Sequence, residues 1–251
     1  MSIDLHEVHK AFGKKEVLKG FSLSIQEGQT VSVIGGSGSG KSVALKHIVG
    51  LLQPDQGEVW VDGENVGRLD RETLYELRRN VGYVFQFAAL FDSMTIEENL
   101  GMGLRRIPEM TEGDIRDRVM QCLTLVDLTG YESRYPSELS GGQRKRAGLA
   151  RAIATKPKYL LYDEPTTGLD PVTTAVIDEL IVRMGDELDV TGLVITHDMQ
   201  SAFRISDRIA MLYDGRIRFE GTPEEVREAS DPVVRGFIEG RPDLMDPMGA
   251  S

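Results

Sequence analysis

The stretch TVSVIGGSGSGKS, at residues 30–42, decides the fold of this 251-residue chain. Its first part, Thr30–Ile34, is short and apolar, which is typical of a parallel strand covered on both faces. Residues 35–42 fit the pattern G-x-x-x-x-G-K-[ST], in which glycines let successive backbone N–H groups point at phosphate oxygens. Lys41 would supply a positive charge to the β and γ phosphates, and the Ser42 hydroxyl can ligand Mg²⁺. The stretch therefore predicts a nucleotide-binding loop between a strand and a helix.

A second apolar strand, YLLYDE at residues 159–164, ends in two carboxylates. In a chain that also carries a phosphate loop, Asp163 is expected to hold Mg²⁺, through water, and Glu164 to polarise the attacking water as a general base. The alternative is an acidic turn that only contacts solvent. The phosphate loop in the same chain favours the hydrolytic interpretation.

A second glycine motif, LSGGQ at residues 139–143, precedes the helical pattern RKRAGLARAIA. Ser140 and Gln143 have the spacing of a capping box, so a helix is expected to begin here. Capping does not require the pair Gly141-Gly142. Two glycine N–H groups at a helix N-terminus would form a second anion-binding site.

Together these motifs resemble those of the ATP-binding cassette (ABC) ATPases, over residues 3–229 and in the order of that family. The resemblance implies that Gln86 contacts Mg²⁺ and the attacking water, that His197 contacts the γ-phosphate, and that Asp170 lies in a loop that crosses a dimer. Phe12 falls where an aromatic side chain stacks on adenine, although a core aromatic is the alternative there. The catalytic residues would be Lys41, Gln86, Glu164 and His197, and the metal-binding residues Ser42, Gln86 and Asp163. The nucleotide-binding residues would be Phe12, Gly35, Gly36, Ser37, Gly38, Ser39, Gly40, Lys41, Ser42, Val43, Ser140, Gly141, Gly142, Gln143 and Asp170.

The expected fold is α/β, because apolar strands alternate with helical patterns. Helices are predicted at 42–52, 111–128, 141–155 and 172–188, and another is predicted to begin at TPEE, 222–225. The resemblance implies a P-loop NTPase of ABC type, with a RecA-like mixed sheet flanked by helices. We expect an N-terminal β-subdomain and the phosphate loop at 1–86, a helical signature subdomain at 87–157, the rest of the core at 158–229 and an extension at 230–251. The tail at 241–251 is predicted to be extended or disordered.

The composition restricts the function classes. A net charge of −11 argues against nucleic acid as the main partner. Cys122 is the single cysteine, so no intrachain disulfide can form, which fits a reducing cytosol. The start of the chain does not resemble a signal peptide, and no apolar run approaches the roughly 18 residues that span a bilayer. We therefore expect any work at a membrane to require a membrane-embedded partner.

Other nucleotide-binding classes fit less well. The chain contains no N-K-x-D motif of a GTPase, and a small-molecule kinase does not use LSGGQ. ABC proteins of DNA repair or translation usually carry two cassettes or a long coiled coil. The resemblance implies a head-to-tail dimer that encloses two ATP molecules and drives a separate permease. Because one phosphate loop and one LSGGQ are present, the second subunit is either another copy or a sister ATPase, and the intact motifs favour a homodimer.

Three segments resemble the ATPases of MCE-type, Mla-like phospholipid transporters: LFDSMT at 90–95, YDEPTTGLD at 162–170 and ASDPVVRGFIEGRPD at 229–243. That group often has Gly at the position of Ala88, and Met or another residue at that of Gln143. The resemblance implies an MCE-domain partner, and peripheral attachment through the permease at the cytoplasmic face of the inner membrane. It leaves open whether the C-terminal extension clasps the partner ATPase. The alternative is an importer of amino acids or other polar solutes.

The apolar run FQFAALF at 85–91 could be core or interface. Thr95 and Glu98 predict a capping box directly after it. In the ABC family this region helps to form the groove for the permease. We therefore expect docking near residues 87–99, with some of four apolar side chains exposed: Ala88, Leu90, Phe91 and Met94.

Overall fold

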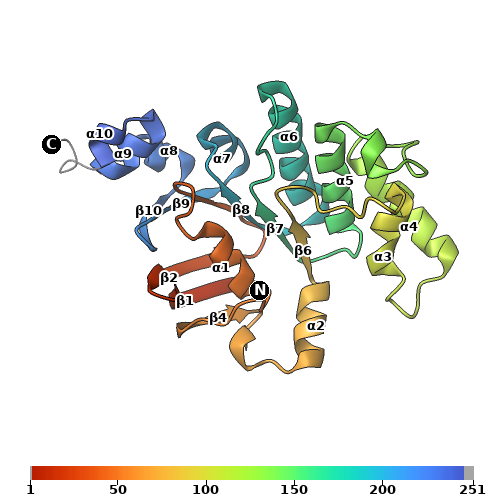
Figure 1. Cartoon of the computed structure of the whole chain (residues 1–251), viewed down its shortest axis with the longest axis horizontal. Helices are drawn as coiled ribbons and strands as arrows, with labels where there is room; N and C mark the ends of the chain where they lie inside the picture. The colour runs from red at the N-terminus through yellow and green to blue at the C-terminus, as the bar shows by residue number, and fades with distance from the viewer. Residues whose placement is uncertain (1, 246–251) are drawn as a thin grey trace. The chain divides into compact units, whose positions relative to one another are not determined.

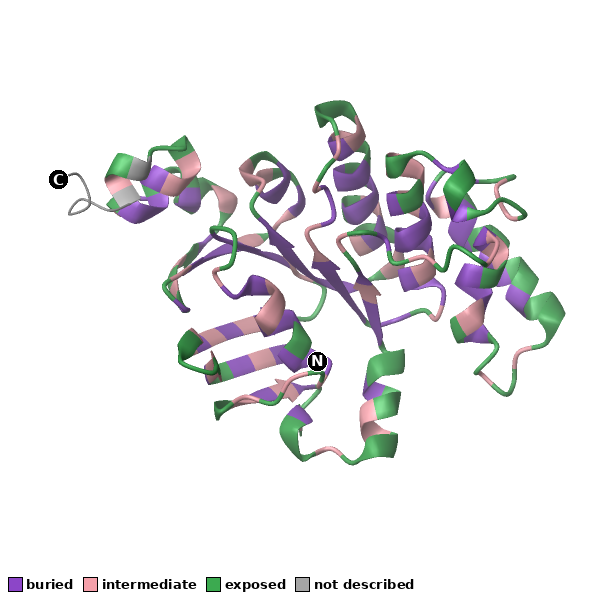
Figure 2. Ribbon diagram, in the orientation of Figure 1, coloured by how far each residue is buried: buried purple, intermediate pink, exposed green. Residues whose placement is uncertain are grey.

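The computed structural model describes residues 2–245 and divides into two compact units. The first unit comprises the chain up to Asp70 together with the chain from Leu193 onward, and the second comprises Arg71–Gly192. Figure 1 shows the helices and strands in chain order. Some strands, such as Thr30–Ile34 in the first unit and Tyr159–Asp163 in the second, are almost wholly buried, whereas other strands and the helices combine buried with half-buried and exposed residues (Figure 2).

The first unit contains an antiparallel sheet with strand order β2-β1-β4-β5. Its strands are β1 (Ser2–Phe12), β2 (Lys15–Gln26), β4 (Gln56–Val61) and β5 (Glu64–Asn65). Ile3 pairs with Ile25 on one side and with Val61 on the other, and all three side chains are buried. Alternating apolar residues therefore build one inner face, as the period-two pattern predicts.

A mixed sheet in the same unit has the order β10-β9-β3-β8. Its strands are β3 (Thr30–Ile34), β8 (Thr191–Thr196, from Leu193 onward in this unit), β9 (Arg208–Tyr213) and β10 (Arg216–Gly221). Strands β3 and β9 are parallel, while β9 and β10 are antiparallel. The helical segments of this unit are α1 (Lys41–Ile48), η1 (Val66–Arg68), α7 (Met199–Ile205), α8 (Pro223–Arg227), α9 (Pro232–Glu239) and α10 (Pro242–Met245).

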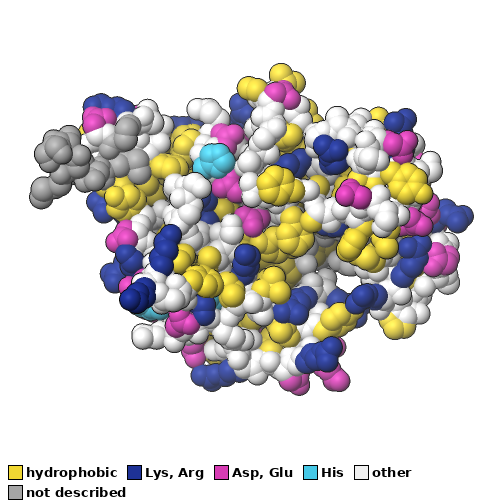
Figure 3. Space-filling view, viewed as in Figure 1, with side chains coloured by type: hydrophobic (Ala, Val, Ile, Leu, Met, Phe, Trp, Pro, Cys, Tyr) yellow, Lys and Arg dark blue, Asp and Glu magenta, His cyan; other side chains and the backbone are white. Residues whose placement is uncertain are grey.

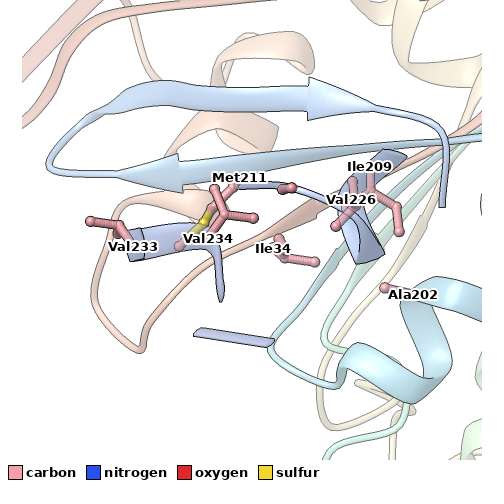
Figure 4. Packing of buried hydrophobic residues seen from close by; sticks show 8 residues of the cluster. Ile34, Ala202, Ile209, Met211, Val226, Val233 and Val234 are labelled. Carbon is pink, nitrogen blue, oxygen red and sulfur yellow. The ribbon is translucent and has the colours of Figure 1, made fainter. Parts of the chain in front are cut away.

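Helices α8 and α9 pack into the hydrophobic core of the first unit (Figure 4). Val226 of α8 and Val234 of α9 are buried with Ile209 and Met211 of β9. The segment 232–239 therefore belongs to the core of this unit. The prediction of an extended or disordered tail at 241–251 is wrong for Pro242–Met245, which form α10, and its remainder, 246–251, lies outside the described residues. Proline at the first position of α10 suits a helix start, because proline has no backbone N–H group and an N–H at this position would have no acceptor within the helix.

The second unit pairs two parallel strands, β6 (Val81–Val84) and β7 (Tyr159–Asp163). Its helical segments are α2 (Arg71–Arg79), α3 (Ile96–Leu104), α4 (Glu112–Leu125), η2 (Pro136–Glu138), α5 (Gly141–Ile153) and α6 (Pro171–Leu188). Leu100, Val119 and Leu149 contribute to the buried surfaces of α3, α4 and α5. Cys122 is buried with a free thiol. Within the described part of the chain, none of the helices is both long and apolar enough to cross a membrane.

Side-chain caps fix several helix starts. The predicted capping boxes Thr95–Glu98, Ser140–Gln143 and Thr222–Glu225 are all confirmed. The helix predicted at 42–52 ends earlier, at Ile48, because Gly50 adopts a positive φ of 62° that terminates the helix.

Candidate functional site

The phosphate loop lies in the first unit, between β3 and α1. Gly40 has a φ of 107°, and a Cβ atom there would lie 2.8 Å from Cγ1 of Val17. A Cβ atom at Gly35 would lie 2.5 Å from the carbonyl oxygen of Leu212. Gly40 therefore requires glycine because of its positive φ and its close packing, and Gly35 because of its close contact with a backbone carbonyl oxygen.

The side chains of this loop suit a phosphate. The Lys41 Nζ is buried and donates to the carbonyl oxygens of Gly35 and Gly36 at 2.8 and 3.1 Å. The Ser39 hydroxyl oxygen is buried and has no hydrogen-bond partner within residues 2–245. Helix α1 begins without a side-chain cap, since its N-cap residue is Gly40. An orphaned hydroxyl, an ammonium group and an uncapped helix N-terminus together fit an anionic ligand.

Phe12 ends β1 and is 48% exposed, so it is available for stacking. The Lys10 Nζ lies 5.9 Å from the centroid of the Phe12 ring. Lys10 is itself held by the carboxylate of Asp55 at 2.7 Å and by the Gln53 carbonyl oxygen at 2.8 Å. The alternative of a core aromatic at Phe12 does not fit this exposure.

His197 follows the buried strand β8 and is exposed. The next residue, Asp198, caps α7 by accepting from the N–H groups of Gln200 and Ser201. The end of the strand and the helix cap thus fix the backbone on both sides of His197. The carboxyl end of a strand is where ligands bind in α/β sheets.

In the second unit, β7 brings Asp163 and Glu164 to its carboxyl end. The Tyr83 hydroxyl of β6 donates to Oδ2 of Asp163 at 3.1 Å, and the Thr167 hydroxyl donates to Oε2 of Glu164 at 3.0 Å. Burial raises the pKa of Tyr83, and the Asp163 charge raises it further. Tyr83 therefore stays protonated and orients the Asp163 carboxylate as a donor.

The LSGGQ motif forms the N-terminus of α5, also in the second unit. The Ser140 hydroxyl accepts from the backbone N–H of Gln143, and Oε1 of Gln143 accepts from the backbone N–H of Ser140. The side-chain amide of Gln143 also donates to the Tyr131 hydroxyl at 2.9 Å. Residues 140–143 and 168–170 line one depression of about 550 Å³. The structure therefore brings together the signature motif and the loop that contains Asp170.

Asp170 has a structural task as well. Its carboxylate accepts from the N–H groups of Val172 and Thr173 at 3.0 Å each and from the Thr173 hydroxyl at 2.5 Å, which caps α6. The hydroxyl bond and these N–H bonds lower the pKa of Asp170. The carboxylate is therefore held ionised at the start of α6, and its predicted contact with a nucleotide stays a prediction.

Gln86 lies two residues after the end of β6, in a segment that contacts side chains of α5. The Lys145 Nζ donates to the Gln86 carbonyl oxygen at 2.5 Å, and Arg151 donates to the carbonyl oxygens of Ala88 and Ala89. Ala88 and Ala89 have positive φ values of 58° and 49°. For residues other than glycine, this left-handed conformation costs about 1–2 kcal/mol each.

Aromatic side chains beside Gln86 reach the solvent. Phe87 is 83% exposed, and Phe85 and Phe91 are 41% and 48% exposed. Some of four apolar residues were expected to line an exposed groove: of these, Phe91 is exposed, Leu90 and Met94 are half-buried, and Ala88 is buried. On the face in Figure 3, hydrophobic side chains reach the surface among interspersed charges of both signs.

Ala88 packs closely against Gly148 of α5. A Cβ atom at Gly148 of α5 would lie 3.1 Å from the Ala88 Cβ, so Gly148→Ala is expected to destabilise the protein by about 1–3 kcal/mol through overpacking. Ala88→Gly removes that methyl group and suits the positive φ. The double variant should therefore recover part of the loss in a denaturant titration, since the Cα atom and the carbonyl oxygen of residue 88 still lie 3.2 and 3.4 Å from that Cβ position. Additive effects of the two substitutions would contradict this packing account.

Three groups in the second unit were not identified from the sequence: Tyr83, Lys145 and Arg151. A tyrosine in an apolar strand looks like a core residue, and two cations in a basic helix look like a solvated face. The partner of Tyr83 lies 80 residues away along the chain, the Gln86 partner of Lys145 lies 59 residues away, and the partners of Arg151 lie 62 and 63 residues away. The sequence signal that could have suggested an inward-facing charge is the position of Lys145 on the helix that begins with the signature motif.

Comparison with known proteins now decides the family. Residues 18–167 match the family described as ABC transporter. The chain belongs to this family. It is 43% identical to the chloroplastic protein TRIGALACTOSYLDIACYLGLYCEROL 3 of Arabidopsis thaliana, over 96% of this chain and 74% of that protein. It is 37% identical to the intermembrane phospholipid transport system ATP-binding protein MlaF of Haemophilus influenzae, over 92% of this chain and 88% of that protein.

Further ABC proteins are similar as well. The sulfate/thiosulfate import ATP-binding protein CysA of Synechocystis is 40% identical, over 95% of this chain and 66% of that protein. A solved ATP-binding cassette, described as a dimeric post-hydrolysis state bound to ADP and Pi, has a TM-score of 0.80 and 35% identity, over 88% of this chain and 98% of that chain. The predicted fold class is thereby confirmed: this chain is an ABC ATPase with the P-loop fold of that family, and ATP is its nucleotide.

Proposed function

We propose that this chain is the ATP-hydrolysing subunit of an ABC transporter that moves phospholipid or another lipid between membranes. The observation that carries the proposal is the similarity to a phospholipid transport ATPase, MlaF, over most of both chains. The sulfate/thiosulfate relative supports the alternative of an importer for polar solutes. The two relatives are 37% and 40% identical, so overall identity does not separate them, and the preference for lipid rests on the resemblance of LFDSMT at 90–95 and YDEPTTGLD at 162–170 to the MCE-type ATPases.

ATP would bind the phosphate loop, with Lys41 at the phosphates and Phe12 at the adenine. Mg²⁺ would be held by Ser42, Asp163 and Gln86. These residues offer hydroxyl, carboxylate and amide oxygens, and Mg²⁺ prefers such hard oxygen ligands together with phosphate and water. When bound, Mg²⁺ supplies charge neutralisation at the phosphates.

The protein's own groups would then act on the water and the γ-phosphate. Glu164 is held by the Thr167 hydroxyl, and its carboxylate would accept the proton of the attacking water. His197 would contact the γ-phosphate. The depression lined by residues 140–143 would close over the ATP of a second copy in a head-to-tail homodimer. The solved cassette described as dimeric supports this assembly.

The proposed partners are a membrane permease that docks near residues 87–99 and an MCE-domain protein. The chain would then be peripheral, at the cytoplasmic face of the inner membrane. The exposed Phe87 and Phe91 support docking, because exposed aromatic patches mark interaction sites. The helical subdomain at 87–157 would carry the docking surface, since α3, α4 and α5 all lie in that range.

Phe87→Asp is expected to abolish recovery of the permease while leaving ATP binding within about twofold and the melting temperature unchanged, since an exposed aromatic contributes little to folding. Co-purification from membranes measures the first effect and isothermal titration the second. Val182→Asp is the matched control, because Val182 is also exposed but lies on α6. Equal permease recovery with both variants would place docking elsewhere.

The substrate is tested by purifying the chain with its native membrane partner and identifying the bound small molecules by mass spectrometry. We expect a phospholipid, a permease and an MCE-domain protein. Recovery of a solute-binding protein without lipid would overturn the lipid proposal in favour of the importer.

A further inference from the structure

Lys145 links the two segments that follow β6 and β7. Its Nζ donates to the carbonyl oxygen of Gln86 at 2.5 Å and to that of Glu164 at 3.4 Å. Lys145 lies on α5, five residues after Ser140, where the signature helix is capped. One ammonium group therefore connects this helix to the backbone of both predicted water-handling residues.

This ammonium group is unusual because it is inside the protein. Lys145 is only 8% exposed, and burial lowers its pKa. A buried charge is unfavourable unless hydrogen bonds compensate it, and a well-packed apolar side chain of the same volume would avoid that cost. The adjacent Arg144 is exposed. The buried ammonium group of Lys145 therefore indicates a specific role for the hydrogen bonds that it donates.

The backbone that these donors reach is strained. Ala88 and Glu164 have positive φ values of 58° and 53°. Such conformations persist only where the surroundings hold them. Arg151 holds the Ala88 carbonyl oxygen at 2.9 Å, and Lys145 reaches the carbonyl of Glu164 itself. The two cations of α5 thus stabilise turns that have no glycine at these positions.

We propose that Lys145 is a positioning residue that fixes the backbone of Gln86 and Glu164 relative to the signature helix, α5. Arg151 adds a second contact from the same helix, and we call Lys145 and Arg151 together the clamp. The proposal rests on the proposed roles of Gln86 and Glu164. The clamp makes one rigid body of the signature motif, the segment after Gln86 and the turn after β7. A displacement of α5 therefore moves the backbone of Gln86 and Glu164 with it.

Hydrogen exchange on the full-length chain tests the clamp without depending on catalysis. In Lys145→Met, amides of peptides 85–91 and 163–168 are expected to exchange at least about tenfold faster, because their turns open locally. Peptides within α3 and β7 should keep their protection. The kcat for ATP should fall about tenfold, with KM changed less than about twofold, because misplacement affects chemistry more than binding. Arg144→Met is the control and should match the wild type in every measurement.

The possible outcomes separate the clamp from the proposed function. Unchanged exchange at 85–91 and 163–168 would overturn the clamp. Faster exchange throughout α3, α4 and α5 would make Lys145 a general packing residue and would also overturn it. Faster exchange confined to the two turns, with kcat unchanged, would support the clamp but overturn the proposed roles of Gln86 and Glu164. Lys145→Gln, which keeps one donor group, is the second variant if Lys145→Met does not fold, and the same pattern is expected with smaller amplitude.

Discussion

Glu164→Gln is expected to lower kcat for ATP hydrolysis by about 10²–10⁴, the usual contribution of a general base. An amide cannot accept the proton of the attacking water, while its size and its acceptor oxygen are nearly those of the carboxylate. The Thr167 hydroxyl, which donates to Oε2 of Glu164 at 3.0 Å, can still donate to the Gln oxygen. ATP affinity should therefore stay within about threefold, and ATP-dependent dimers should accumulate because the nucleotide persists.

Single-turnover hydrolysis and size-exclusion chromatography with ATP measure the two effects. Glu187→Gln is the matched control, because it makes the same change of charge at an exposed position of α6. Undiminished hydrolysis in Glu164→Gln would exclude Glu164 as the general base and would mean that another group accepts the proton of the attacking water.

The phosphate loop could be predicted from the sequence because it is determined locally. The strand Thr30–Ile34 was predicted with its observed bounds, and α1 was predicted to start one residue late. Glycine at positions 35 and 40 signals a turn that no other residue fits. The capping boxes were equally visible, since both partners lie within one helical turn. These are the elements whose stabilising groups are neighbours along the chain.

Elements that depend on distant partners were missed. Strands β9 and β10 and helices α2, α7 and α9 were not predicted individually, and α9 is short enough that its burial against β9 must hold it. The contact between Lys145 and Gln86 could not be predicted for the same reason, because these residues are 59 positions apart in the sequence. The exposure of side chains at 85–91 also depended on tertiary packing: Phe87 points to solvent, whereas Ala88 packs against Gly148 of α5.

Lys41→Met is expected to weaken ATP binding by about a hundredfold, because charge-assisted hydrogen bonds are worth about 1.5–3 kcal/mol each. The structure allows this loss to be separated from folding. Lys41 is buried, and its Nζ donates to two carbonyl oxygens of the loop. Methionine fills the space of the lysine stem without a buried charge, so the melting temperature should stay the same or rise.

Isothermal titration with ATP and calorimetric unfolding without nucleotide measure these two quantities on the same sample. Lys46→Met is the control, since Lys46 is on the same helix but exposed, and it should bind ATP as the wild type does. At one high ATP concentration, stabilisation by ATP should be smaller by about 2.7 kcal/mol in Lys41→Met, because it grows with the logarithm of the ATP concentration divided by Kd, and Kd rises about a hundredfold. If Lys41→Met bound ATP normally, the ammonium would serve only to close the loop through Gly35 and Gly36. If Lys41→Met lost both ATP binding and stability, the hydrogen bonds from Lys41 to the carbonyl oxygens of Gly35 and Gly36 would contribute more free energy to folding than burial of the lysine charge costs.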